Sequence, residues 1–176
     1  MAVITTTGLV PVRARYVVQV RGKQMRLAEA LIQRSDCQKR FEQVKQRIVG
    51  NAKVQEGDQP SEDPGALIQE MEGIASELLK LIARINKTNS STIYSGDKTM
   101  TDALAERDVL MLRRKVYSDL ARSASVIQAR TSRSEVKFLS TVNVKDVQTK
   151  IDALSKEYRD LDSGLQELNW KTNLMD

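Results

Sequence analysis

Apolar residues recur every three or four positions along four stretches of the chain, with polar residues between them. The most regular row has steps that alternate between three and four throughout; its members are Val144, Val147, Ile151, Leu154, Tyr158, Leu161, Leu165 and Leu168. This spacing is typical of an α-helix that packs lengthwise on other helices, as in a coiled coil or a helical bundle. Asn143 is suited to cap the start of this helix, and Asp146 is suited to its positive end.

Three earlier stretches predict helices of the same kind. The first is expected to end at Gly50 and Asn51, which suit the left-handed conformation that closes many helices. Asp63 and Pro64 predict the start of the second helix, as an N-cap and a first-turn proline. Thr101 is expected to cap the third helix. The rows at helical spacing are Leu27, Ala30, Arg34, Cys37, Phe41, Val44 and Ile48 in the first, Leu67, Met71, Ile74, Leu78, Leu81 and Ile85 in the second, and Ala105, Val109, Leu112, Val116, Leu120, Ala124 and Ile127 in the third.

The net charge alternates in sign between successive predicted helices, which indicates how they pair. It is +3 over residues 25–49, −3 over 61–86, +2 over 101–131 and −2 over 143–170. Helices of opposite charge attract each other along their flanks. The sequence therefore predicts an all-α fold, in which four long amphipathic helices form two antiparallel hairpins, or a helical bundle, with coiled-coil-like seams.

Two stretches outside the helices have patterns of their own. Residues 86–97 form a polar connection that ends in Thr92-Ile93-Tyr94-Ser95-Gly96-Asp97, a pattern that suits a small β-hairpin. Residues 1–24 alternate apolar and polar positions and carry +4 of the total net charge of +5. We expect residues 1–24 to be an extension outside the fold and residues 25–176 to be a single domain. The alternative is an arm that adds a strand to another subunit or partner.

The residue content excludes several kinds of site. The chain has no histidine, which removes Ser-His-Asp and Cys-His nucleophilic systems and histidine-bearing zinc sites. Cys37, the only cysteine, is interpreted as a small buried residue, with a reactive thiol as the alternative. The acidic residues of the connection 50–63 lack the order of a calcium loop. We predict no catalytic, cofactor-binding or metal-binding residue, no cofactor, and a cytoplasmic location.

The basic charge does not indicate a nucleic-acid partner. Most of it belongs to residues 1–24, and Arg113, Arg114 and Lys115 are consecutive, so they fan around their helix and form no single patch. A membrane is not expected either, because no apolar run approaches the roughly 20 residues that span a bilayer. The sequence identifies no small-molecule substrate.

Six ordered segments carry a resemblance to a known family. The sequence is similar to a small bacterial family often labelled septicolysin, over about Met25 to Leu174; the segments are MRLAEALIQRSDCQKR, NAKVQEGDQPSEDP, LIARINKTNSS, TDALAERDVL, SRSEVKFLSTVNV and LQELNWKTNL. The resemblance implies a helical fold and assembly into homo-oligomers, with a hexamer as the expected state. We do not expect the pore-forming activity that the label implies, because the predicted fourth helix carries a net negative charge, the wrong sign for anionic lipid.

Three classes of function follow, and an oligomeric helical structural or interaction protein ranks first. Its expected partner is itself, and Trp170 is a candidate interface anchor. The seam residues expected in the core or in the oligomer are Leu67, Met71, Ile74, Leu78, Ile151, Leu154, Tyr158, Leu161, Leu165 and Leu168. An enzyme ranks second, using carboxylates, Lys53, Arg130 and Arg133 of the connections 50–63 and 130–142. A nucleic-acid or membrane-surface binder is the third class.

Overall fold

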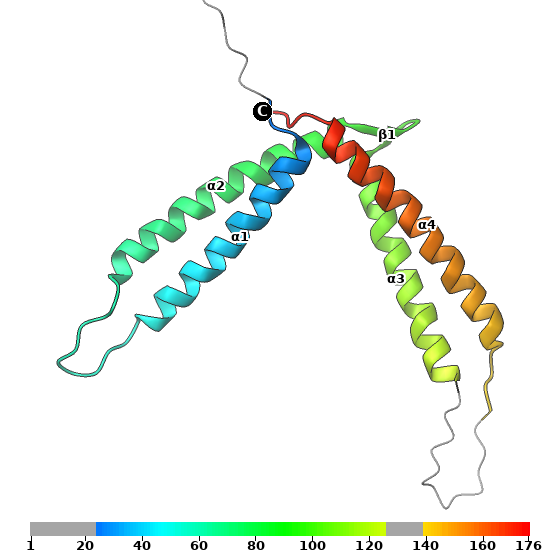
Figure 1. The fold of residues 1–176 in the computed structure, drawn as a ribbon, viewed down its shortest axis with the longest axis horizontal. Helices are drawn as coiled ribbons and strands as arrows, with labels where there is room; N and C mark the ends of the chain where they lie inside the picture. The colour runs from blue at the N-terminus through cyan, green and yellow to red at the C-terminus, as the bar shows by residue number, and fades with distance from the viewer. Residues whose placement is uncertain (1–23, 126–138) are drawn as a thin grey trace, which may run out of the picture.

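The computed structural model describes residues 24–125 and 139–176. They form helices α1 (Leu27–Gly50) and α2 (Pro64–Ser91), a two-stranded antiparallel hairpin of β1 (Ile93–Ser95) and β2 (Lys98–Thr99), and helices α3 (Met100–Ala124) and α4 (Val144–Lys171). Helix α1 packs along α2, and α3 packs along α4 (Figure 1). The predicted all-α class and the two antiparallel hairpins are therefore confirmed.

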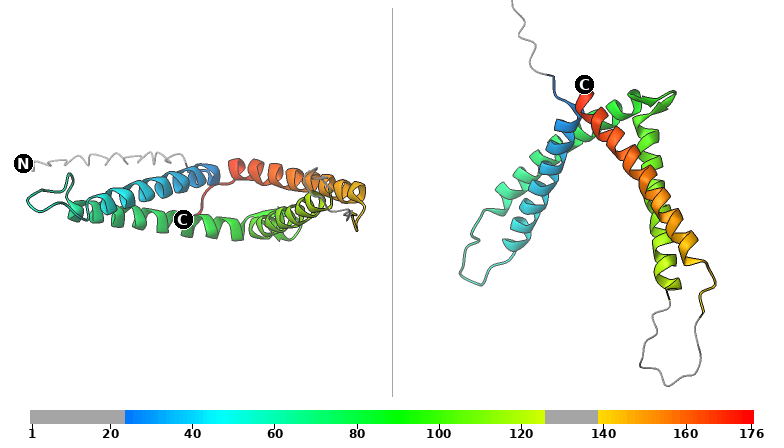
Figure 2. Two further views of the ribbon diagram at one scale, coloured as in Figure 1. Left: turned by 90° about the horizontal axis from the view of Figure 1, so that it is seen from below. Right: turned by 45° about the vertical axis from the view of Figure 1, so that its right-hand side comes forward.

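The two helical hairpins meet at one end and diverge from there, so the molecule has the shape of a V (Figure 1). We call the two hairpins the α1–α2 arm and the α3–α4 arm, and their meeting point the apex. Each arm is a single helix pair, with no third helix of the described chain along its length (Figure 2). A helix in such an arm has one neighbour only, so an amphipathic helix with a broad apolar face cannot bury all of it within the arm.

The predicted caps hold two of the helix starts in place. The Asp63 side chain accepts hydrogen bonds from the backbone amides of Gly65 and Ala66, at 3.0 and 3.2 Å, and Pro64 is the first residue of α2. The Asn143 side chain accepts hydrogen bonds from the amides of residues 145 and 146 in the same way at the start of α4. Both caps satisfy amides that have no partner inside their own helix.

Two predicted helix boundaries are wrong in detail. Helix α2 continues to Ser91, past the expected connection at residue 86, because Thr88 is fully buried at the apex and donates a hydrogen bond to the Arg84 carbonyl at 2.8 Å. Helix α3 is capped by Thr99, not Thr101.

The reason for the shifted cap is the position of Asp102. Its carboxylate accepts the Thr99 amide at 2.9 Å, while the Thr99 hydroxyl accepts the Asp102 amide at 3.2 Å. This reciprocal pair requires the acidic residue at the third helical position. Helix α1 does end at Gly50 as expected, but without a left-handed residue: Asn51 has a φ of −99°, and its side chain donates to the Arg47 carbonyl at 2.9 Å.

The two ends of the domain are joined at the apex. The Leu27 amide donates to the Thr172 carbonyl at 2.9 Å, and the Leu174 amide donates to the Met25 carbonyl at 2.8 Å. Leu27 and Leu174 are both buried in the main apolar cluster. The ordered fold thus includes Met25, whereas the predicted extension 1–24 lies outside the described residues except for Gln24.

The small β-hairpin, which the sequence predicts, packs on α4 through one aromatic ring. Tyr94 lies over Gly164, where an added Cβ atom would be 2.5 Å from the tyrosine oxygen. A glycine is therefore required for this close approach. The contact fixes the β-hairpin against the arm that follows it in the chain.

Candidate functional site

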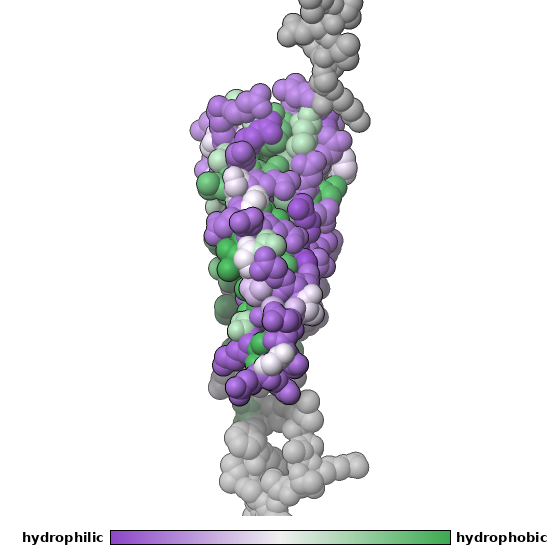
Figure 3. Space-filling model, turned by 90° about the vertical axis from the view of Figure 1, so that its left-hand side faces the viewer, coloured by the Kyte–Doolittle hydropathy of each residue, from purple (hydrophilic) through white to green (hydrophobic). Residues whose placement is uncertain are grey.

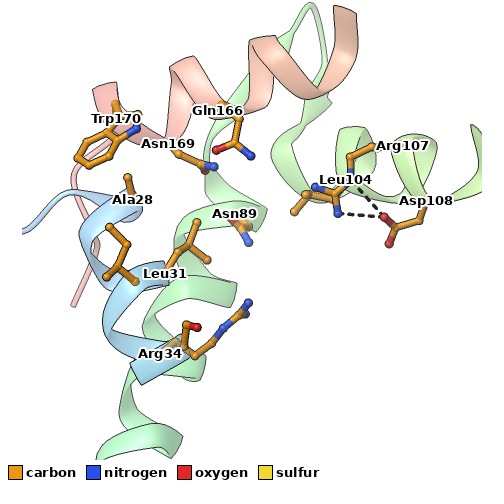
Figure 4. Close-up of a pocket in the computed structure, with 12 residues that line it drawn as sticks. Ala28, Leu31, Arg34, Asn89, Leu104, Arg107, Asp108, Gln166, Asn169 and Trp170 are labelled. Carbon is orange, nitrogen blue, oxygen red and sulfur yellow. Dashed lines mark hydrogen bonds and ion pairs between the residues drawn. The ribbon is translucent and has the colours of Figure 1, made fainter. Parts of the chain in front are cut away.

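A cleft of about 660 Å³ opens at the apex, and all four helices line it (Figure 4). Its apolar side is formed by residues such as Leu31 and Ile32 of α1, Leu104 of α3 and Trp170 of α4. Its polar side chains are Arg34, Ser35, Asn89, Arg107, Asp108, Gln166 and Asn169. The cleft lies where the two arms begin to diverge. Only the helical turns nearest the apex therefore contribute side chains to its lining.

Arg34 is the unusual residue of this cleft. It occupies a position in the apolar row of α1, between Ala30 and Cys37, which are both buried. Its side chain extends from α1 into the cleft toward Asn89 (Figure 4). Its Nε is buried and has no hydrogen-bond partner, and this is so for no other side-chain nitrogen or oxygen within residues 24–125 and 139–176. A buried donor without an acceptor costs about 1–3 kcal/mol, so this position favours an acceptor that the described residues do not supply.

The other arginine of the cleft is already neutralised. Arg107 pairs with Asp108 at 3.0 Å and with Asp162 of α4 at 3.5 Å. Burial opposes its charge, but the hydrogen bond and the charges of these two carboxylates outweigh burial and raise the pKa of Arg107. Arg34 is therefore the cation of the cleft that has no carboxylate partner among the residues described.

A second feature lies on the outside of the α3–α4 arm. The row that the sequence predicts for α3 is exposed in the structure: Val109, Leu112 and Val116 have exposed fractions of 53%, 62% and 66%. The residues of α3 that are buried are Ala103 and Leu110, with Met100 at the apex. At about 100° per residue, Leu112 lies about 180° around the helix from Ala103. The predicted row thus faces away from α4, and its last member, Ile127, lies outside the described residues.

Two arginines share with Ala103 and Leu110 the side of α3 that does face α4. Arg107 bonds across to α4, and the Arg114 guanidinium lies 5.8 Å from the ring centroid of Tyr158. The arm therefore has arginines beside a buried apolar contact that includes Leu110, while aliphatic side chains of α3 also lie on its surface. By contrast, the face shown in Figure 3 is mostly hydrophilic, with hydrophobic residues scattered over it.

The predicted seam residues lie within the two arms. Leu67, Ile74, Leu154 and Leu165 are buried, and Met71, Leu78, Ile151, Tyr158, Leu161 and Leu168 are half-buried. The partial burial follows from the single neighbour that each helix has. Trp170, the candidate interface anchor, is 55% exposed at the rim of the cleft.

The described parts of the two polar connections do not converge on one site. Residues 51–63 lie at the far end of the α1–α2 arm, and residues 139–142 lie at the far end of the α3–α4 arm (Figure 1). Lys53 is thus remote from this second connection, while Arg130 and Arg133 lie outside the described residues. The described part of the chain holds no cluster of three metal-ligating side chains. None of its helices is long and apolar enough to cross a membrane.

Cys37 is buried, with an exposed fraction of 3%. Burial raises the pKa of its thiol, and the nearby Glu77 carboxylate adds to this effect. A raised pKa keeps the sulfur protonated at neutral pH, and the thiolate is the reactive form. The prediction that Cys37 is a small buried residue is confirmed.

Sequence reasoning missed the polar residues of the cleft. Arg34 gave the one available signal, because a charged residue stood in a row of otherwise apolar positions. Asn89, Arg107, Gln166 and Asn169 gave none, since they come together only where the two arms meet.

Comparisons with known proteins give relatives without an assigned activity. A family model described as a family of unknown function (DUF6847) matches residues 34–174. A crystal structure of a functionally unknown conserved protein from Corynebacterium diphtheriae has 44% sequence identity and a TM-score of 0.82, and the match covers 87% of this chain and 100% of that one. No curated protein matches the sequence.

Proposed function

Because the chain belongs to the family of unknown function DUF6847, we propose a function from its surface: it is a helical scaffold protein that assembles with copies of itself. The observation that carries this proposal is the exposed apolar row of α3. Leu112 and Val116 are more than 60% exposed, and Val109 and Leu120 lie on the same side of the helix. A continuous row of this kind is typical of an interface, whereas single exposed apolar residues are ordinary.

The energetics favour a copy of the chain as the occupant of this row. Fully burying a valine or leucine side chain contributes about 1.5–3 kcal/mol, so these half-exposed side chains would each add about 1–2 kcal/mol in an interface. A closed symmetric assembly uses the same row on every copy and leaves no row exposed. The half-buried seam of α4 is available to the same assembly. We propose a homo-oligomer, and a hexamer as its state.

The proposal is tested by measuring mass in solution with light scattering after size exclusion. The chain has a mass of 19.8 kDa, and we expect the unmodified protein to have a multiple of it. The double variant Leu112→Glu and Val116→Glu should give the monomer mass, because charged side chains do not leave water without a partner. Circular dichroism should show that the variant keeps its helices.

Leu79→Glu is the matched control. Leu79 is 69% exposed, as much as the residues of the row, but it lies on α2, in the other arm. The control should keep the multimeric mass. A monomer mass for the unmodified protein would overturn the proposal, as would equal masses for the two charged variants.

We propose a cytoplasmic location for this scaffold. The support is the single, buried cysteine, which suits a reducing compartment. The resemblance to proteins labelled septicolysin stays a prediction, and we propose no lytic role with it.

A further inference from the structure

The cleft at the apex has features that self-association through α3 does not use. We propose that it binds a small organic anion, whose carboxylate or phosphate pairs with Arg34 and whose apolar part lies against Trp170 and Leu31. The ligand class follows from the charge, the amide groups and the apolar surface that the cleft brings together.

Arg34 is the anchor for the anionic group. Its planar fork of N–H donors matches the two oxygens of a carboxylate or phosphate. The next two arginines of α1 already have carboxylates: Arg40 pairs with Glu77 at 3.5 Å, and Arg47 pairs with Glu70 at 3.2 Å. Arg34 has no such partner in the described chain, and its buried Nε lacks an acceptor.

The neighbours of Arg34 favour an anion over a neutral ligand. The acidic group in the cleft lining is the Asp108 carboxylate, and it forms an ion pair with Arg107. Amide groups of Asn89 and Gln166 face the same space from α2 and α4 and can donate to further oxygens of the ligand (Figure 4). The cleft therefore keeps one positive charge surrounded by neutral donors.

The size and lining of the cleft require more than an inorganic ion. A volume of about 660 Å³ lies within the usual range of small-molecule sites, about 300–1,000 Å³. The Trp170 ring, 55% exposed at the rim, offers a flat apolar surface beside the polar groups. A carboxylate from a second copy is the competing occupant, and it is less suited to a cleft whose lining comes from all four helices of one chain.

The test uses Trp170 itself as the reporter, since it is the only tryptophan of the chain. The full-length protein is titrated with phenyl phosphate, benzoate and inorganic phosphate while the emission is recorded. We expect a saturable change with phenyl phosphate or benzoate, and binding of inorganic phosphate at least about tenfold weaker. Arg34→Gln should weaken the binding of the aromatic probe at least about tenfold, because a hydrogen bond to a charged group contributes about that factor or more.

Arg40→Gln is the control, since Arg40 lies on the same helix outside the cleft; it should leave the dissociation constant within about twofold. Arg34→Lys keeps the positive charge but lacks the planar fork of N–H donors, so it should bind the aromatic probe with intermediate strength. This result would distinguish loss of the paired hydrogen bonds from a general loss of structure.

Absence of a saturable signal with both aromatic probes would overturn the proposal, as would equal weakening of probe binding by Arg34→Gln and Arg40→Gln. A changed mass of Arg34→Gln together with no probe binding would assign the cleft to a second copy. Mass and emission are separate readouts, so this test and the assembly test fail independently.

Discussion

The two arms have the same architecture but use their apolar residues differently. In the α1–α2 arm, the predicted rows supply the internal contact, with Cys37 and Val44 facing Ile74 and Leu81 in one cluster. Ion pairs flank this contact on the outside. In the α3–α4 arm, the row of α3 faces solvent, and arginines contact α4 beside buried residues such as Leu110.

The difference shows that a helical period identifies the apolar face of a helix but does not identify what that face packs against. A row at helical spacing states that one side of a helix is apolar. In α1 and α2, most of the predicted row is buried or half-buried within the arm. In α3, the predicted row is exposed to solvent. This exposed apolar row is the reason to assign an external partner to the α3–α4 arm.

The largest expected effect is the difference in stability between two single variants of the α3–α4 arm. One truncates a buried seam residue, and the other truncates an exposed residue of the α3 row. Leu154 of α4 is 1% exposed, whereas Leu112 of α3 is 62% exposed. Leu154→Ala should lower the free energy of unfolding by about 2–5 kcal/mol, because it leaves a cavity. Leu112→Ala should change it by no more than about 0.5 kcal/mol in dissociated protein. Urea unfolding at a concentration that gives the monomer mass measures both.

The same pair should reverse its order in an association assay. Leu112→Ala is expected to weaken assembly more than Leu154→Ala does, once both proteins are folded. If Leu112→Ala unfolds as easily as Leu154→Ala in the monomer, then the row of α3 is internal, and the contrast between the arms is wrong.

A smaller effect is expected where the β-hairpin touches the α3–α4 arm. Replacing Gly164 by alanine removes a helix-destabilising glycine, a gain of about 1 kcal/mol. In the native protein, the new methyl group would meet the Tyr94 oxygen at 2.5 Å, so the gain should be lost or reversed. In a Tyr94→Ala background, the same Gly164→Ala change should stabilise the protein. A double-mutant cycle by thermal melting gives the coupling between the two positions.

Gly73 provides the matched control for this cycle. It lies in α2, and an added Cβ atom would have no neighbour within 4 Å. Gly73→Ala should stabilise the protein equally in both backgrounds. If Gly164→Ala stabilises the native protein as much as Gly73→Ala does, then Tyr94 can move aside without lowering the free energy of unfolding.

Much of the fold could be predicted because helical rows and caps are local signals. Asp63, Pro64 and Asn143 mark helix starts through bonds to amides two or three residues away. The wrong end of α2 depended on a distant residue, whereas the cap of α3 at Thr99 is a local signal that the sequence reasoning missed. Thr88 stays helical because its hydroxyl accepts the amide of Met175, at 3.0 Å, from the other end of the domain.

The cleft could not be predicted for the same reason. Its polar groups come from four helices and meet only because the arms diverge at a shared apex. Arg34 gave a local signal, an arginine in an apolar row, but only the packed apex shows that no carboxylate of residues 24–125 and 139–176 pairs with it. The exposed row of α3 was visible as a row, yet its direction depended on Arg107 and Arg114 facing α4.

The smallest expected effects come from one carboxylate in each arm. Hydrogen bonding to Arg47 lowers the pKa of Glu62 from its ordinary 4.5, and hydrogen bonds from Thr99 lower the pKa of Asp102 from its ordinary 3.8. A carboxylate with a lowered folded-state pKa stabilises the fold fully above its unfolded-state pKa, and this contribution is lost as the pH falls through the folded-state pKa. Glu62→Gln and Asp102→Asn should therefore melt below the unmodified protein at pH 7 and approach it below about pH 4.

Salt should distinguish the two arms in this measurement. Glu62 and Arg47 form a charged pair at the surface, and about 1 M NaCl strongly screens the attraction between them. Asp102 acts through short hydrogen bonds within a helix cap, at 2.6 and 2.9 Å to Thr99, which salt affects less. Melting temperatures between pH 2 and 7, at about 0.1 and 1 M NaCl, should show the Glu62→Gln difference shrinking in high salt and the Asp102→Asn difference persisting. A difference that grows as the pH falls would contradict the direction of both pKa shifts.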